Sequence, residues 1–337
     1  MNRYYLGTFP PVYGGVTIKN LNLFKALSEQ IDISKVDFSE IKRKNILELL
    51  KLIRVLINKN NVFVIGVTGK KTRRRFCKLL YYVNKTSMKK SLMFLMGGAV
   101  ANDIACDASF RKYVSQFKKI YAETEGMKRL LENAGLDNVE IYPNGRFKPI
   151  ENNEIYKQKV KEDKFKCVFF SLINELKGVS NILETACLLS DIDFYFYGVI
   201  EPKYKDFFIN KTNELPNVFY NGVFESDKNN IYNELVKYDV LLLPTQYKTE
   251  GIPGILVEAK MAGIPAIVSD VCYNAEIVND GVDGIVLEEN TVGDLKKALE
   301  FLKENPSELY KMKKLASQSA SVYYIENYID NIVNELR

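Results

Sequence analysis

Short apolar runs alternate along the chain with longer segments in which apolar residues recur every three or four positions. The short runs are typical of strands in a buried sheet, and the longer spacing is typical of helices that cover a sheet. This alternation predicts βαβ units and parallel sheets. Strands are expected at residues 4–9, 62–68, 92–96, 119–123 and 139–142, and again at 167–173, 194–199, 218–220, 240–243, 266–269 and 285–287.

A lysine-rich stretch at residues 148–166 follows Pro143-Asn144-Gly145 and has the composition of a linker. The chain has 337 residues, which at about 100 to 200 residues per domain favours two domains. We therefore expect an α/β protein with two doubly wound, Rossmann-like domains at residues 1–147 and 148–320. A C-terminal helix at 321–337 is expected to pack back on the first domain, and the cleft between the domains is the default site.

The composition excludes several kinds of chemistry. Histidine is absent, so the commonest metal ligand and the commonest general base near neutral pH are both missing. The five cysteines have no C-x-x-C spacing, which argues against a zinc site and against a disulfide framework. No apolar run approaches the length of about 20 residues that spans a bilayer, and the N-terminus lacks an apolar signal core. We expect a cytoplasmic protein that needs no metal or other cofactor.

The charge is distributed unevenly. Residues 49–102 contain twelve Lys or Arg and no Asp or Glu, which indicates an anionic partner. In 70–90 the basic residues alternate with aliphatic and aromatic ones, as in a helix that lies on an anionic membrane surface. The alternative is a solvated helix whose aromatic residues point into the core. No nucleic-acid motif accompanies the charge, so nucleic acid is not expected as a partner. The candidate membrane-binding residues are Lys70, Lys71, Arg73, Arg74, Arg75 and Lys78.

The segment 244–270 contains a candidate anion site. An apolar run ends at Pro244, a loop follows, and Pro253 suits the first turn of a helix. The backbone N–H groups of the next three residues would then face an anion at the positive end of the helix dipole, where a diphosphate fits. Glu250 in the loop and Glu258 about one turn inside the helix could accept hydrogen bonds from hydroxyls on either side of it. The three amides are those of Gly254, Ile255 and Leu256.

The same segment resembles the E-x7-E signature of the retaining glycosyltransferases of family four, which have the GT-B architecture. In that family the first Glu contacts the donor hexose and the second the ribose, roles that the resemblance gives to Glu250 and Glu258. Residues 269–287 resemble a continuation found in enzymes of bacterial capsule and exopolysaccharide assembly. By the same resemblance, the donor phosphates would be approached by Gly14, Gly15 and Lys177, the last followed by Gly178.

The chain also departs from the family pattern. An Arg usually stands five residues before the Lys, and here the position is Leu172. The frequent His of the first domain is missing as well. Asp103 or Asp107, shortly after Gly97-Gly98, is a candidate for orienting the acceptor hydroxyl, and Asp103 is the one we select. The alternative, which the sequence favours, is that both are solvated or capping carboxylates.

The resemblance implies an enzyme that moves a hexose from a nucleotide diphosphate sugar to a lipid-linked or oligosaccharide acceptor in bacterial surface polysaccharide synthesis, at the inner face of the membrane. In retaining enzymes of this type the leaving phosphate takes the acceptor's proton, so the carboxylate pair of a glycosidase is not required. The alternatives are a non-catalytic homologue that serves as a partner subunit or sugar-nucleotide binding module, and a sugar-nucleotide epimerase on the same fold.

Overall fold

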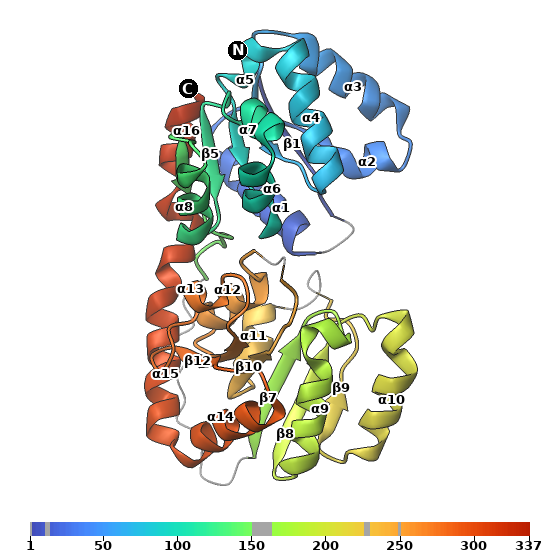
Figure 1. The fold of residues 1–337 in the computed structure, drawn as a ribbon, viewed down its shortest axis with the longest axis vertical. Helices are drawn as coiled ribbons and strands as arrows, with labels where there is room; N and C mark the ends of the chain where they lie inside the picture. Colours follow the sequence, from blue (N-terminus) through green and yellow to red (C-terminus); the bar gives the residue numbers. More distant parts are fainter. Residues whose placement is uncertain (1, 11–13, 150–163, 226–229, 249–250) are drawn as a thin grey trace. The chain divides into compact units, whose positions relative to one another are not determined.

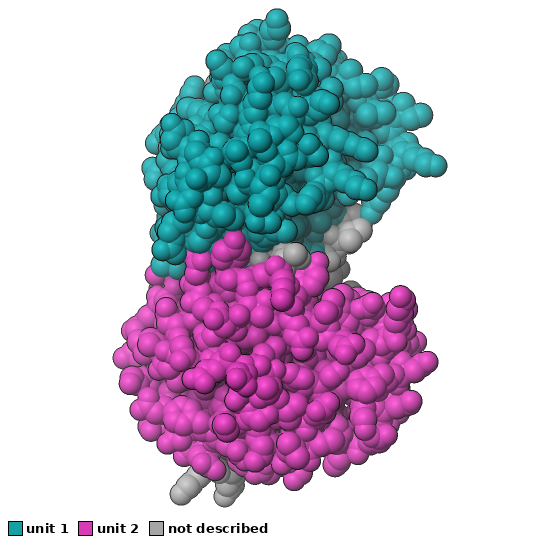
Figure 2. Space-filling model, viewed as in Figure 1, with its two compact units in different colours: residues 1–148, 249–252, 322–337 teal, residues 149–248, 253–321 magenta. Residues whose placement is uncertain are grey.

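The computed structural model describes residues 2–10, 14–149, 164–225, 230–248 and 251–337 (Figure 1). The chain divides into two compact units (Figure 2). Unit 1 contains residues 1–148, 249–252 and 322–337, and unit 2 contains residues 149–248 and 253–321. No described helix has both the length and the apolar character needed to cross a membrane.

Unit 1 is built on one parallel sheet of six strands, in the order β2-β1-β3-β4-β5-β6. Helices cover both faces of this sheet (Figure 1). The strands are β1 (Arg3–Gly7), β2 (Ser34–Asp37), β3 (Val62–Gly66), β4 (Leu92–Phe94), β5 (Lys119–Ala122) and β6 (Val139–Ile141). The helices are α1 (Gly15–Gln30), α2 (Phe38–Lys42), α3 (Ile46–Ile57), α4 (Lys70–Val83), α5 (Lys85–Met88), α6 (Ala99–Cys106), α7 (Ala108–Val114), α8 (Glu125–Asn133), η4 (Ile325–Asn327) and α16 (Ile329–Leu336).

Unit 2 also has a parallel sheet of six strands, in the order β12-β11-β10-β7-β8-β9. The strands are β7 (Phe165–Phe170), β8 (Ile192–Tyr197), β9 (Val218–Tyr220), β10 (Val240–Leu243), β11 (Ala266–Ser269) and β12 (Gly284–Leu287). The helices are η1 (Glu175–Lys177), α9 (Val179–Leu188), η2 (Pro202–Tyr204), α10 (Lys205–Glu214), α11 (Ile231–Leu235), α12 (Gly254–Met261), α13 (Asn274–Ile277), α14 (Val292–Glu304) and α15 (Pro306–Ser319), with η3 (Ala320–Tyr323) leading into unit 1.

The expected doubly wound α/β class is confirmed, and every expected strand is present. The sequence did not predict β2, which is an edge strand of four residues with only Val36 and Asp37 buried. A strand that shows one apolar side chain to the core carries too short a pattern to recognise. Several strands end earlier than expected because the apolar run continues into the loop, as at Phe9, which is buried although it follows β1.

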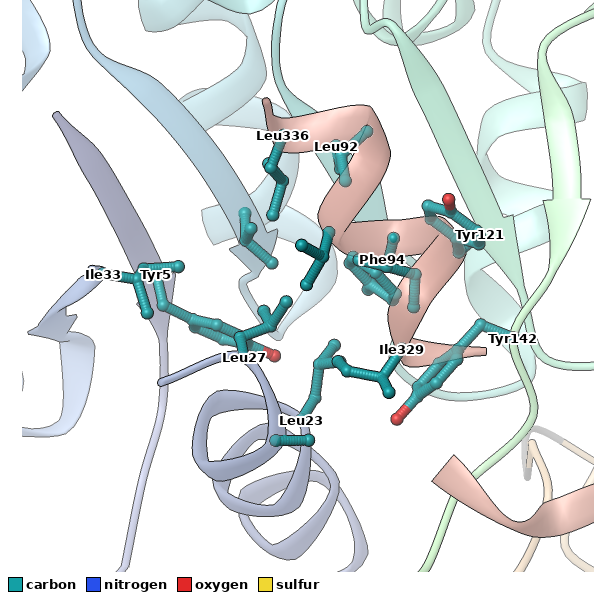
Figure 3. Packing of buried hydrophobic residues seen from close by; sticks show 14 of the residues in the cluster. Tyr5, Leu23, Leu27, Ile33, Leu92, Phe94, Tyr121, Tyr142, Ile329 and Leu336 are labelled. Atoms are coloured by element: carbon teal, nitrogen blue, oxygen red, sulfur yellow. The ribbon is translucent and has the colours of Figure 1, made fainter. Parts of the chain in front are cut away.

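The core of unit 1 is completed by a segment distant in sequence (Figure 3). The buried side chains Ile329, Ile332 and Leu336 of α16 belong to the same apolar cluster as Leu23 and Leu27 of α1. The chain therefore returns to unit 1 after it has formed unit 2, and α16 covers part of the first sheet as an amphipathic helix.

Candidate active site

The strand order of unit 2 predicts where a ligand would bind. The chain starts the sheet at β7, adds β8 and β9 on one side, and then adds β10, β11 and β12 on the other. β7 and β10 are therefore neighbours whose following connections lead to opposite sides of the sheet. Ligands of doubly wound sheets bind at the carboxyl ends of such a pair of strands. These two connections contain Lys177 and the segment from Pro244 to α12.

The two connections are hydrogen-bonded to each other. The Gln246 N–H donates to the carbonyl oxygen of Leu176 at 2.7 Å, and the Thr245 hydroxyl donates to the same oxygen at 3.3 Å. Asn174 caps η1 by accepting the Lys177 N–H at 3.0 Å. Gly178 has a φ of 76°, and a Cβ there would lie 2.0 Å from the carbonyl oxygen of Pro244. The Lys-Gly pair therefore needs glycine both for its left-handed backbone and for the close approach of the two connections.

Lys177 is the most unusual side chain at this position. It is 9% exposed, and its Nζ lies 5.4 Å from the ring centroid of Tyr247. Burial lowers the pKa of Lys177 to about 8, because the charged form is poorly solvated there. Cys272, from the connection after β11, approaches the same place, with its Sγ 3.7 Å from the carbonyl oxygen of Tyr247. A buried lysine at the end of a parallel sheet is suited to hold an anion that enters from solvent.

The helix α12 begins after Pro253, as the sequence predicts, and has its N-terminus in this region of unit 2. The amides of Gly254 and Ile255 make no hydrogen bond to any residue that the structure describes. The Leu256 N–H instead donates to the carbonyl oxygen of Pro253 at 3.1 Å, because the first turn is tight. This corrects the expectation that all three amides are available to an anion.

Of the two acidic candidates, Glu258 is the one that lies among the described residues. Glu258 lies half-buried in the second turn of α12. Glu250 lies outside the described residues. Leu172, which stands where the family has an Arg, is 43% exposed and therefore is not a core residue.

In unit 1 the corresponding divergence falls between β1 and β3. Gly14 caps α1 and donates its N–H to the Thr17 hydroxyl at 3.0 Å. Gly14 and Gly15 are exposed, and a Cβ on either would meet no described atom within 4 Å. Packing within the described part of the chain thus imposes no requirement for glycine at these two positions.

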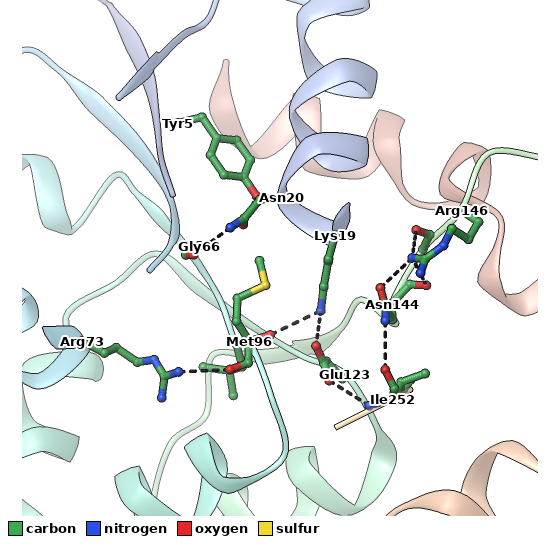
Figure 4. Close-up of polar contacts among 12 residues, drawn as sticks. Tyr5, Lys19, Asn20, Gly66, Arg73, Met96, Glu123, Asn144, Arg146 and Ile252 are labelled. Atoms are coloured by element: carbon green, nitrogen blue, oxygen red, sulfur yellow. Dashed lines mark hydrogen bonds and ion pairs between the residues drawn. The ribbon is translucent and has the colours of Figure 1, made fainter. Parts of the chain in front are cut away.

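A buried ion pair in unit 1 holds the residues that follow Glu250 (Figure 4). Lys19 Nζ lies 2.8 Å from Glu123 Oε1, with side chains that are 2% and 4% exposed. Glu123 Oε2 accepts the Ile252 N–H at 3.1 Å, and Asn144 donates to the Ile252 carbonyl at 2.9 Å. Both polar groups of the Ile252 backbone are therefore fixed by unit 1. No sequence signal distinguishes Lys19 or Glu123, since each resembles an ordinary charged residue on an amphipathic helix or at a strand end.

Two of the basic candidates on α4 form ion pairs with the carboxylates on and directly after α6. Lys70 forms an ion pair with Asp103 at 2.6 Å, and Arg74 forms one with Asp107 at 3.0 Å. Asp107 also caps α7 by accepting the Phe110 N–H. The capping alternative is therefore correct for Asp107, and Asp103 is a partner of Lys70.

Arg73 corrects the membrane-binding set. It is 5% exposed, and its guanidinium donates to the carbonyl oxygens of Val67 and Met96 at 3.2 and 3.0 Å. Arg73 is thus a structural residue that joins α4 to the ends of two strands and is not available to a lipid surface. The exposed remainder of the set, without an ion pair to any described residue, is Lys71, Arg75 and Lys78.

The chain is similar to a known protein family and to a curated protein. A family model described as glycosyl transferases group 1 matches residues 151–319. An uncharacterized 41.2 kDa protein in the cps region of Klebsiella pneumoniae is 26% identical over 171 residues, which cover 51% of this chain and 44% of that protein. The chain thus matches less than half the length of this curated relative.

Several solved structures can be aligned with 99% or more of this chain. Anabaena Alr3699/HepE in complex with UDP-glucose has a TM-score of 0.74 at 13% identity and covers 99% of both chains. The lipopolysaccharide outer core galactosyltransferase WaaB has a TM-score of 0.68 at 14% identity and covers 100% of this chain and 99% of its own. Sucrose-phosphate synthase from Thermosynechococcus elongatus has a TM-score of 0.75 at 12% identity, with 99% and 98% covered.

The expected GT-B fold of two Rossmann-like units is therefore confirmed. The family match begins just after Pro149 and ends with α15, so that it coincides closely with unit 2 and includes both Lys177 and α12. On this evidence the chain belongs to the family of glycosyl transferases group 1.

Proposed function

We propose that the chain is a retaining glycosyltransferase that moves a hexose from a nucleotide diphosphate sugar to a lipid-linked or oligosaccharide acceptor in bacterial surface polysaccharide synthesis. The observation that carries the proposal is the buried Lys177 beside the ring of Tyr247, at the strand divergence of the unit that the family model matches. The relative from a cps region and the complex of Alr3699/HepE with UDP-glucose support the pathway and the donor class.

The residues have separate roles in this proposal. The ammonium of Lys177 and the amides of Gly254 and Ile255 neutralise the diphosphate as it leaves. Glu258 accepts hydrogen bonds from the ribose and Glu250 from the hexose, and Gly14 and Gly15 let the backbone of unit 1 approach the phosphates. Since these groups supply positive charge and donors, we propose that the reaction needs no metal ion.

The transfer step balances without a protein nucleophile. The bond between the anomeric carbon and the phosphate oxygen breaks, and the acceptor oxygen bonds to the same face of that carbon. The proton of the acceptor hydroxyl passes to the departing phosphate oxygen. Asp103, already paired with Lys70, is proposed only to orient the acceptor.

The donor part of the proposal is tested by isothermal titration calorimetry with a panel of UDP, GDP, ADP and dTDP sugars and the matching free nucleotides. Glu258→Gln should weaken a sugar nucleotide and its free nucleotide alike, whereas Glu250→Gln should weaken mainly the sugar nucleotide. Glu304→Gln, at an exposed carboxylate at the end of α14 in the same unit, is the control and should bind as the wild type does. Unchanged affinity in both glutamate variants would refute the donor site.

Turnover requires a separate measurement. Proton NMR of the product with a lipid-linked acceptor, with and without EDTA, should show that the anomeric configuration of the donor is retained and that chelation leaves the rate unchanged. Binding of a donor without transfer to any acceptor in the panel would identify the chain as the non-catalytic homologue. An inverted product would refute retention.

A further inference from the structure

The helix α3 carries apolar side chains on two of its faces, and only one of these two faces is covered. Leu52, Val55 and Leu56 are buried against unit 1. On the other side a row of aliphatic side chains, spaced four, three and four residues apart, is 50 to 70% exposed. This spacing places them on one stripe of the helix. The row, called here the α3 row, is Ile46, Leu50, Ile53 and Ile57.

Such a row is not an ordinary surface feature. Single exposed leucines are common, whereas contiguous exposed apolar patches mark surfaces that bind a partner or a membrane. Leu47 and Leu49, which are 78% and 43% exposed, widen the patch on both sides. The α3 row therefore lacks a covering element within the part of the chain that the structure describes.

The charges around the α3 row indicate what covers it. Residues 42–90 contain fifteen Lys or Arg and a single acidic residue, Glu48. Glu48 is half-buried and accepts the Asp37 N–H at 2.8 Å. In contrast, Lys44 before the helix, Arg54 on it and Lys59 after it are exposed and make no ion pair with a described residue.

The neighbouring helix adds to the same positive field. α4 lies beside α3 within unit 1 (Figure 1). Its exposed side chains Lys71, Arg75, Lys78 and Tyr82 repeat at four, three and four residues, so they too share one stripe. An aliphatic row with a basic border and an interfacial tyrosine is complementary to an anionic lipid bilayer.

We propose that α3 inserts the α3 row into the headgroup region of an anionic membrane, while the cations of α3 and α4 contact the lipid phosphates. In this proposal α3 makes the apolar contact with the membrane, and not the 70–90 segment that the sequence indicated. The inference rests on the proposed lipid-linked acceptor for its biological sense, but it does not require transferase activity. The occupant is lipid and not a second protein, because a surface with this excess of one charge has its complement in a continuous anionic sheet.

Vesicle co-sedimentation tests the proposal with the full chain, using phosphatidylcholine alone and mixtures with increasing phosphatidylglycerol. The wild type should bind in proportion to the anionic content and dissociate at high salt. Leu50→Asn combined with Ile53→Asn should lower the partition coefficient about tenfold or more, since both side chains leave water on binding. Arg75→Gln combined with Lys78→Gln should lower it about tenfold on the anionic vesicles only.

Matched controls come from unit 2. Leu188→Asn, at a side chain that is 59% exposed, and Lys297→Gln, at one that is 81% exposed, should bind vesicles as the wild type does. All the changed side chains are exposed, so the thermal unfolding midpoint should not move. Transfer to a water-soluble acceptor should also be unchanged in the α3 variant, which separates this inference from the proposed activity.

Two results would overturn the inference. The first is that the α3 variant sediments with anionic vesicles as well as the wild type does, or that neither binds. The second is a concentration-dependent dimer, seen by analytical ultracentrifugation without lipid, that the Leu50 and Ile53 changes abolish. The second result would show that α3 covers another copy of the chain.

Discussion

Lys177 lies at the end of the unit 2 sheet, where burial disfavours the charged form of its side chain. Its side chain is almost fully buried, and its ammonium lies over the ring of Tyr247. The result is a pKa lowered to about 8. A diphosphate bound beside the ammonium would favour its charged form, so binding of the anion and protonation of Lys177 should be linked.

This lysine predicts a pH dependence of donor binding. Below about pH 8 Lys177 is already protonated, and affinity for a nucleotide diphosphate should be constant. Above that pH the free protein loses the proton and must take it up again on binding, so the Kd should rise by up to about tenfold per pH unit. Calorimetry at pH values on both sides of 8, in buffers of different ionisation enthalpy, measures the affinity and the proton uptake together.

Lys177→Gln is the control for the pH dependence. The variant should bind the nucleotide more weakly, because a charge-assisted hydrogen bond is lost, and its Kd should no longer rise in this pH range. A wild-type Kd that stays flat to pH 10, or a variant that keeps the full pH dependence, would show that another group titrates.

At this scale the sequence and the structure agree in part. The order of motifs located Lys177 and Glu258 within a strand, loop and helix pattern that the structure contains, while their roles stay a prediction. The same reasoning treated Lys71 and Arg73 alike, although one is exposed and the other is buried with carbonyl partners. A run of like charges does not reveal which member turns inward, since that depends on the strands below the helix.

At the scale of elements, the start of α9 is fixed by a contact and not only by a turn. Gly178 and Gly222 have the same φ of 76°, but only a Cβ on Gly178 would collide with the chain. At Gly222 nothing lies within 4 Å. The two glycines therefore separate the cost of the left-handed backbone from the cost of the close approach to Pro244.

We predict that Gly222→Ala lowers the free energy of unfolding by about 1 to 2 kcal/mol, the cost of a left-handed residue with a side chain. Gly178→Ala should lower it by a further 1 to 3 kcal/mol or so, because the connection after β10 must shift. Denaturant unfolding followed by circular dichroism measures both. Equal losses in the two variants would show that the contact with Pro244 relaxes freely.

The strands show why elements were easier to predict than their surroundings. Central strands such as β10, with four buried residues, are recognised from composition alone. The edge strand β2 and the exposed side of α3 were not, because both depend on whether a neighbour covers them. Periodicity identifies a helix and its apolar stripe, but a helix with apolar residues on two faces gives no indication of which of them faces water.

At the scale of the whole molecule, unit 1 is assembled from pieces of chain that lie on either side of unit 2 in sequence. An apolar cluster in its core contains residues from β1, α1 and α16. Lys118 and Lys119 further join β5 to α16 through ion pairs with Glu335 at 2.9 and 3.0 Å. The stability of unit 1 therefore depends on a segment more than 170 residues beyond the end of its first piece.

We predict that Ile332→Ala, at a side chain that is 1% exposed, lowers the free energy of unfolding of unit 1 by about 2 to 5 kcal/mol. Asn334→Ala, on the exposed side of the same helix, should change it by less than about 0.5 kcal/mol. Hydrogen exchange followed by mass spectrometry assigns the loss, since β1 and α1 should exchange faster while β10 and β11 of unit 2 stay protected. Equal acceleration in both units would show that they unfold as one.

The return of α16 to unit 1 also sets an order of events during synthesis. Residues 1–148 leave the ribosome before residues 329–336, so the cluster that contains Leu23, Leu27 and Tyr142 lacks its α16 members until then. Unit 2, whose sheet is contiguous apart from one short loop, can close before unit 1 does. A chain cut short within α16 would thus keep unit 2 folded while exposing an apolar surface of unit 1, where chaperones and proteases would recognise the defect.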